Sequence, residues 1–75
     1  MELCLCDCEI NKEYVISKIV QNDMIKNRLM CFGFLPKEKI KLLKYNYKNT
    51  CCLVKVMGIN YAVDKKVCEG IIVCV

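Results

Sequence analysis

The residues best suited to chemistry in this chain are its cysteines, which number eight among 75 residues. Cys4, Cys6 and Cys8 alternate with other residues, so an extended segment would project the three thiols to one side. Three thiolates could hold a soft metal ion such as zinc. The chain has no histidine and no C-x-x-C pair, however, and zinc ligands usually pair across a turn. The pattern therefore favours no metal or other cofactor, and a Cys4-Cys6-Cys8 metal site is the alternative.

The remaining cysteines point to structural roles. Cys51 and Cys52 are neighbours in an expected strand, so their side chains should lie on opposite faces and cannot readily serve one metal. Cys68 and Cys74 are expected to be small buried hydrophobic residues. Because no secretory signal opens the chain, we expect all these thiols to be reduced.

Catalytic groups are missing from the sequence. Ser17 is the only serine, and the chain has no histidine to activate it. There is no phosphate-binding loop and no glycine motif for a dinucleotide. The carboxylates at Asp23, Glu38, Asp64 and Glu69 are scattered rather than paired for acid-base work. We expect a protein that is not an enzyme.

The most clearly marked structural element is a short amphipathic helix that begins near residue 23. Asn22 or Asp23 can cap its start, since a short side-chain oxygen accepts a hydrogen bond from the first turn. Ile25, Leu29 and Phe32 follow at i, i+4 and i+7, which predicts that they form the buried stripe of the helix.

The end of this helix is also marked. Gly33 is expected in a left-handed conformation as the helix C-cap, and Phe34 could fold back onto Leu29 in a Schellman motif. Pro36 prevents the helix from resuming.

Short alternating or apolar runs predict the strands. They lie at 14–19, 40–45, 51–57, 59–63 and 71–75, with a polar loop at 46–50 and a helical turn at 65–69 that Asp64 can cap. Cys52, Val54 and Val56 should lie on one side of their strand, and Gly58 should mark the following turn. The expected fold is mainly β: a single domain over 1–75, built as a small SH3-like barrel of about five strands with one short α-helix between the first and second strands.

The order and spacing of these features resemble a known family. The matching residues of its central motif are Arg28, Leu29, Met30, Cys31, Phe32, Gly33, Phe34, Pro36, Lys37 and Ile40, followed by Tyr61-Ala62-Val63, Cys68 and Ile71-Ile72-Val73. This arrangement is similar to the FeoA family of small cytoplasmic accessory proteins of bacterial ferrous iron transport. Cys31 replaces a usual acidic residue, and Lys37 replaces a usual glycine. The resemblance also places Leu5 and Cys8 where the family carries inward-facing leucines.

The resemblance implies a function. A family member would be a non-catalytic, cytoplasmic protein that docks on the cytosolic part of the FeoB transporter and modulates iron uptake. It would approach the membrane only through that partner. A competing class is the SH3-like regulatory domain at the C-terminus of iron-dependent repressors, which follows a DNA-binding domain. No run approaches the roughly 18 apolar residues of a transmembrane helix, in keeping with a cytoplasmic location.

A docking surface is predicted on the outer side of the helix. Hydrophobic residues make up 56% of the chain, more than so small an interior can hide, so exposed apolar patches for a partner or a homo-oligomer are expected. The buried stripe turns Lys26, Asn27 and Met30 outward. Together with the neighbouring arginine and the following loop, the predicted partner-binding residues are Lys26, Arg28, Met30, Phe34 and Leu35.

The net charge of +4 raises a third possibility, a small-barrel nucleic-acid-binding module. Lys37, Lys39, Lys41, Lys44 and Lys48 lie within twelve residues, close to Tyr45 and Tyr47. Lysine on an edge strand is ordinary protection against edge pairing, and nucleic-acid binders more often interleave arginines with stacking aromatic residues. Because the chain has one arginine, no nucleic-acid partner is expected.

Overall fold

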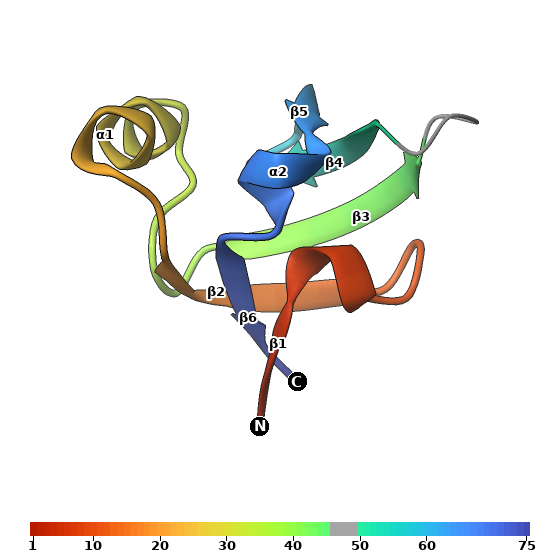
Figure 1. Ribbon diagram of the computed structural model, residues 1–75. Helices are drawn as coiled ribbons and strands as arrows, with labels where there is room; N and C mark the ends of the chain where they lie inside the picture. The colour runs from red at the N-terminus through yellow and green to blue at the C-terminus, as the bar shows by residue number, and fades with distance from the viewer. Residues whose placement is uncertain (46–49) are drawn as a thin grey trace.

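The computed structural model describes residues 1–45 and 50–75. Its elements are β1 (Glu2–Cys4), the 3-10 helix η1 (Leu5–Asp7), β2 (Glu13–Ile19), α1 (Asp23–Cys31), β3 (Lys39–Tyr45), β4 (Cys51–Val56), β5 (Ile59–Asp64), α2 (Lys65–Cys68) and β6 (Ile71–Cys74). The strands form one antiparallel sheet in the order β1-β6-β2-β3-β4-β5. Figure 1 shows this sheet curling on itself, with α1 standing beside it. Most of the predicted polar loop, 46–49, lies outside the described residues.

The predicted fold class is confirmed, with one strand more than the expected five. The additional strand is β1, so the predicted first strand is β2 and the helix lies between β2 and β3. Strand β1 has three residues, too few for a visible alternation. It exists because it pairs with β6 at the far end of the chain, where Leu3 lies opposite Val73. Such a long-range pairing leaves no local signal in the sequence.

The core lies inside the curl of the sheet. The side chains below 2% exposure are Leu5, Ile16, Phe34, Ile40, Leu42, Cys52, Val54, Val56, Cys68, Ile71 and Val73. The predicted inward faces of Cys52, Val54 and Val56 are confirmed, as is the burial of Leu5 and of Cys8, which is 7% exposed.

One buried cysteine was wrongly predicted. Cys74 is exposed, whereas Cys68 is buried as expected. Ile71 and Val73 face the core from β6, so the two-residue period of the strand turns Cys74 outward.

Strands β4 and β5 form a hairpin with a two-residue turn. Val56 pairs with Ile59 across Met57 and Gly58, whose φ angles are 52° and 79°. Positive φ at both central residues is the signature of a type I′ turn, the connection that matches the twist of the flanking strands. The turn predicted at Gly58 is confirmed, and it fixes the register of β5.

Helix α1 begins as predicted, but fewer of its apolar side chains are buried than predicted. The Asn22 side chain accepts a hydrogen bond from the Ile25 N–H at 2.9 Å. Leu29 is buried and Ile25 is half-buried, but Phe32 is 50% exposed. The prediction of Phe32 in the buried stripe was therefore wrong. Phe32 is the C-cap of a helix that stands beside the sheet rather than across it, so its side chain reaches the surface.

The predicted helix end is confirmed. Gly33 has φ 99°, and its N–H donates to the Met30 carbonyl at 3.1 Å. The Phe34 N–H donates to the Leu29 carbonyl at 3.0 Å. These two bonds are the paired contacts of a Schellman motif, and they satisfy carbonyl groups that the helix end would otherwise leave open.

A β-turn follows the helix. The Glu38 N–H donates to the Leu35 carbonyl at 3.0 Å, with Pro36 and Lys37 as the central residues. Lys37 has φ 76°, as the third position of a type II turn requires. The turn thus keeps a conformation that suits glycine, although this chain has lysine at the position where the family pattern has glycine.

Helix α2 forms at the predicted helical turn, but its predicted cap does not. The Asp64 side chain makes no capping hydrogen bond, and the Lys65 N–H donates instead to the Thr50 carbonyl at 3.0 Å. At the other end, the Gln21 side chain donates to the Val67 carbonyl at 3.1 Å. Among the described residues, neither helix is long and apolar enough to cross a bilayer.

Candidate functional site

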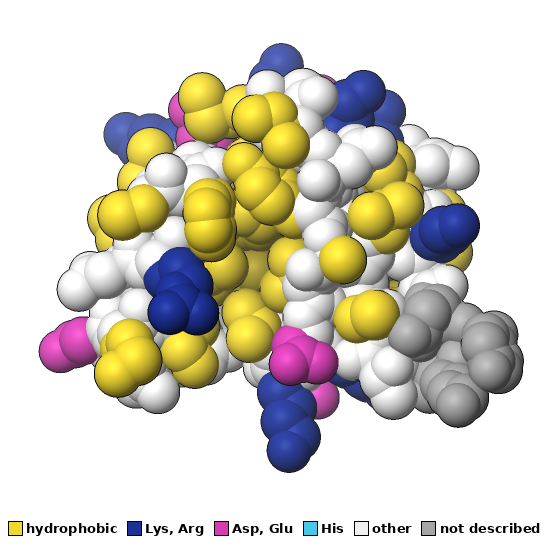
Figure 2. All heavy atoms as spheres, turned by 90° about the horizontal axis from the view of Figure 1, so that it is seen from above, with side chains coloured by type: hydrophobic (Ala, Val, Ile, Leu, Met, Phe, Trp, Pro, Cys, Tyr) yellow, Lys and Arg dark blue, Asp and Glu magenta, His cyan; other side chains and the backbone are white. Residues whose placement is uncertain are grey.

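An apolar groove separates α1 from β5 and α2, and we call it the α1–β5 groove. It encloses about 350 Å³. Its lining residues are Ile25, Arg28, Leu29, Phe32, Phe34, Tyr61, Ala62, Val63, Asp64 and Val67. Figure 2 shows hydrophobic side chains lining a hollow in this face of the molecule. The volume lies in the range typical of ligand-binding clefts.

Tyr61 joins the two walls of the groove at one end. Its hydroxyl donates a hydrogen bond to the Phe32 carbonyl at 3.1 Å, and its ring lies 5.6 Å from the Phe32 ring and 5.3 Å from the Phe34 ring, centroid to centroid. Tilted aromatic pairs at this separation are favourable. They hold β5 at a fixed distance from the end of α1.

A second apolar surface continues from the groove, and we call it the apolar shelf. It is formed by Met30, Cys31, Phe32, Gly33, Leu35, Met57, Ile59 and Tyr61. Met57 is 64% exposed and Ile59 is 54% exposed. Phe32 and Tyr61 belong to both surfaces, so the groove and the shelf form one continuous region. The expected exposed apolar surface is confirmed.

The five predicted partner-binding residues do not share one surface. Arg28 lines the groove, whereas Met30 and Leu35 lie on the shelf. Lys26 lines neither surface; it lies with Lys18 and Met30 around a separate small pocket, so Met30 is the residue that links it to the shelf.

Phe34 requires a correction, because it is 1% exposed and packs against Tyr61. As the hydrophobic partner of the Schellman motif, Phe34 folds back beneath the groove and forms part of its floor rather than an exposed contact. The docking role of the other four residues stays a prediction.

The sequence reasoning missed the part of this surface that the β4–β5 hairpin supplies. Met57, Ile59, Tyr61 and Ala62 come from the β4–β5 hairpin, which was read only as strand and turn. One signal was present. Met57 is a large apolar residue in the position before Gly58, within a turn that must face solvent.

Thiols gather beside α2, but not in the predicted arrangement. Cys6 lies in η1, so Cys4, Cys6 and Cys8 do not project to one side of an extended segment. The Cys4 thiol donates to the Glu69 carbonyl at 3.2 Å, and the Cys6 thiol donates to the Lys65 carbonyl at 3.7 Å. Among residues 1–45 and 50–75, no group of three or more histidine, cysteine or acidic side chains is placed to hold a metal ion.

Burial keeps the thiols of Cys6, Cys8 and Cys68 protonated. It raises the pKa of Cys6 to about 12 and that of Cys8 to about 11, and it raises the pKa of Cys68 well above its usual range. The thiolate, not the thiol, is the nucleophile and the metal ligand, so these cysteines are inert at neutral pH.

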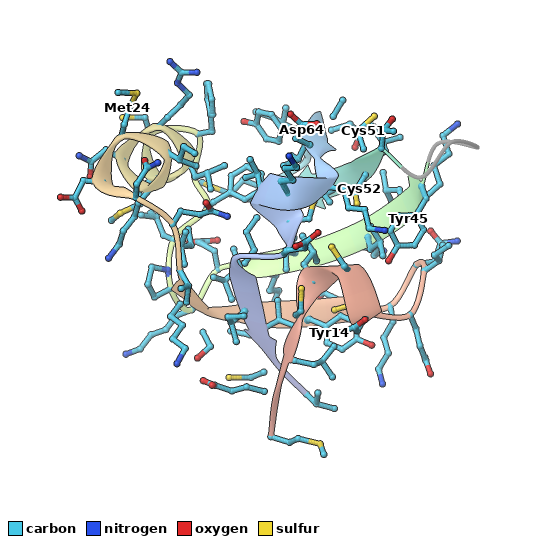
Figure 3. All side chains as sticks on the ribbon, viewed as in Figure 1. Tyr14, Met24, Tyr45, Cys51, Cys52 and Asp64 are labelled. Atoms are coloured by element: carbon cyan, nitrogen blue, oxygen red, sulfur yellow. The ribbon has the colours of Figure 1, made fainter. Side chains whose placement is uncertain are left out.

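Tyr45 closes the core beside these thiols. Burial raises its pKa to about 12, and its hydroxyl donates to the Cys6 carbonyl. Figure 3 shows Tyr45 and Cys52 on the neighbouring strands β3 and β4. Tyr45 is half-buried, and its hydroxyl is engaged within the molecule rather than turned outward beside a stacking surface. Tyr47 and Lys48, the other members of the predicted basic and aromatic cluster, lie outside the described residues.

The basic face of β3 carries acidic neighbours. Lys39 Nζ lies 3.8 Å from Glu13 Oε1 on β2, at the solvent-exposed surface. Lys37, Lys39, Lys41 and Lys55 line a polar pocket of about 410 Å³ that also includes Glu13 and Glu38. These carboxylates reduce the positive potential that a phosphate backbone would meet.

Comparison with known proteins decides the family. The family model described as FeoA domain matches residues 3–75. The chain belongs to the FeoA domain family. A search of curated proteins finds no match.

Solved structures similar to this FeoA domain agree in fold. The FeoA protein from Chlorobium tepidum is 20% identical, with a TM-score of 0.89 over 95% of this chain and 68% of that one. Stenotrophomonas maltophilia FeoA complexed with zinc, described as a procaryotic SH3 domain protein, is 20% identical, with a TM-score of 0.83 over 96% and 89% of the two chains. T. acidophilum IdeR is 23% identical, with a TM-score of 0.85 over 99% of this chain but only 34% of that one. At these identities the likeness shows the shared SH3-like fold.

Proposed function

We propose that this FeoA domain is a non-catalytic accessory protein of ferrous iron transport that works in the cytoplasm by docking on the cytosolic part of a FeoB-type transporter. Membership of the family supports the link to iron transport. The S. maltophilia relative is described as possibly acting as a bacterial ferrous iron transport activating factor. The partner-binding surface is the α1–β5 groove together with the apolar shelf.

The observation that carries this proposal is the continuous apolar region on one side of the molecule. Phe32, Met57 and Ile59 are each at least half exposed and lie beside one another on the shelf. Single exposed hydrophobic residues are common, but a contiguous group that lines a groove is typical of an interaction surface. Methionine side chains adapt readily to a partner.

Arg28 adds a specific polar contact at the edge of this surface. The side chain is exposed and lines the groove. Among the described residues, it forms no ion pair or side-chain hydrogen bond. An unpaired guanidinium beside an apolar groove can form a charge-assisted hydrogen bond with a partner carboxylate.

The test is a calorimetric titration of the chain against the cytosolic domain of a FeoB-type transporter. Met30→Asp should preserve the fold and weaken binding by at least about tenfold, since a charge placed on a desolvated apolar contact costs on the order of 1–2 kcal/mol or more. Met24→Asp is the matched control. Met24 lies on the same helix and is 75% exposed, but it lines neither surface.

The same titration can refute the choice of surface. Equal binding by both methionine variants, with loss of binding in Lys41→Glu or Lys44→Glu, would assign docking to the basic face of β3. Steep weakening by added salt would accompany that result, because charge contacts are screened and apolar contacts are not.

A further inference from the structure

The edge of the sheet beside the groove has unused backbone hydrogen-bonding groups. Among the strands of the described residues, β5 is the last in the sheet order and pairs only with β4. Since Val56 and Ile59 close a two-residue turn, they form a hydrogen-bonded pair, and the bonded pairs then alternate along the hairpin. Tyr61 and Val63 therefore direct their N–H and C=O groups toward β4. Asn60 and Ala62 direct theirs away from the sheet.

Nothing in the described part of the chain uses those outward groups. Asn60 and Ala62 take part in no backbone or side-chain hydrogen bond beyond the β4 ladder. Both residues are exposed. The other edge of the sheet is shorter, because β1 has three residues whereas β5 has six. The edge of β5 is thus the longer open edge.

This open edge lies in the wall of the α1–β5 groove. Ala62 lines the groove, between Tyr61 and Val63, and Ile25 and Leu29 line it from α1. A chain that paired with the β5 edge would place alternate side chains against this apolar lining, because successive residues of a strand point to opposite faces. Backbone pairing would supply affinity, and the groove would select the side chains.

We propose that the β5 edge recognises an extended segment of the partner protein by adding it to the sheet as a seventh strand. The segment would be about five residues long, with apolar side chains at alternate positions and an acidic residue that reaches Arg28. This inference rests on the proposed docking function and specifies how the same surface binds. A single extended chain suits the site better than a second folded copy, because α1 stands across the groove from β5 and leaves a slot.

Amide hydrogen exchange tests this proposal on the unmodified protein. Free in solution, the amides of Asn60 and Ala62 should exchange rapidly, whereas those of Tyr61 and Val63 should be slow because they are bonded to β4. Addition of the cytosolic domain of a FeoB-type transporter, at concentrations where calorimetry shows saturation, should slow the Asn60 and Ala62 amides by at least about tenfold.

Two variants of Ala62 separate the backbone from the side chain. Ala62→Pro removes the outward N–H without touching the β4 ladder, a position at which an edge strand tolerates proline. It should abolish binding. Ala62→Val keeps the N–H and adds a β-branched side chain suited to a strand, so it should weaken binding much less than Ala62→Pro does. Circular dichroism of both variants establishes whether each is folded, and the exchange experiment stands even where Ala62→Pro does not fold.

The outcomes separate strand addition at β5 from docking itself. Calorimetric binding with Asn60 and Ala62 still exchanging rapidly would overturn strand addition and leave the docking function standing. Absence of binding would overturn both. Concentration-dependent protection of the same amides in the isolated protein would overturn the proposal in favour of a second copy of this chain.

Discussion

The Met57 thioether packs over Gly33, at the junction of the β4–β5 hairpin and the end of α1. A Cβ atom at residue 33 would lie 2.7 Å from Met57 Sδ, closer than such atoms approach in proteins. The backbone at Gly33 has φ 99°, which side-chain-bearing residues rarely adopt. The positive φ is the constraint that favours glycine at this position, whereas the exposed Met57 side chain can move aside at lower cost.

Replacement of Gly33 should destabilise the fold. Gly33→Val places a β-branched residue at positive φ and a methyl group against Met57, so the free energy of unfolding should fall by more than about 1 kcal/mol. Thermal melting measures the loss. In the Met57→Ala background the steric contact is absent but the backbone strain remains, so a smaller penalty should persist there. An unchanged melt in both backgrounds would mean that the helix ends without the left-handed residue.

Replacement of Lys37 by glycine should stabilise the fold. Its φ of 76° is costly for lysine and free of strain for glycine, so Lys37→Gly should stabilise the protein by about 0.5–1 kcal/mol, after allowance for the greater chain entropy of glycine. Urea unfolding can measure this gain. Lys37→Ala is the control, because it removes the side chain but keeps the unfavourable φ. A gain of the same size in Lys37→Ala would attribute the effect to charge rather than to the backbone.

The raised pKa values of Cys6, Cys8 and Tyr45 predict that the free energy of unfolding falls at alkaline pH. In the folded protein the pKa of Cys8 is raised to about 11 and those of Cys6 and Tyr45 to about 12. The unfolded chain therefore releases these protons at lower pH than the folded chain. The stabilisation is fully present below about pH 9 and is lost as the pH rises from about 9 to 12.

Urea unfolding midpoints across this window provide the measurement. The midpoint should fall steadily above about pH 9, and Cys8→Ala should remove part of that fall. A midpoint that stays constant up to about pH 11 would show that the three groups titrate alike in the folded and unfolded chains.

Local patterns predicted the parts of this fold whose causes are local. The Asn22 cap, the glycine at residue 33 and the turn at Gly58 each follow from the conformational preference of one or two residues. Strand β1 could not be found in this way, because it exists only through pairing with β6. The helical turn η1 replaces the extended segment that was expected at Cys4, Cys6 and Cys8. It likewise depends on long-range contacts, with α2 and with Glu69 at its end.

Of the candidate site, the sequence predicted residues of the helix and the loop after it, but not those of the β4–β5 hairpin, for the same reason. The helical period correctly turned Met30 outward, and that residue is 37% exposed. It could not show that Phe32 would face Tyr61 across a groove, because the two residues are 29 positions apart. The open edge at Asn60 and Ala62 depends on the strand order of the whole sheet, which no short pattern contains.

The central claim is that the α1–β5 groove and the apolar shelf bind the cytosolic domain of a FeoB-type transporter. Nuclear magnetic resonance of the isotope-labelled chain, titrated with that unlabelled domain, tests it most directly because it reports on every backbone amide at once. We predict saturable shift changes centred on Arg28, Phe32, Ile59 and Ala62, with Lys39 and Lys41 little affected. Changes confined to the lysine face of β3, or no saturable change at all, would contradict the claim.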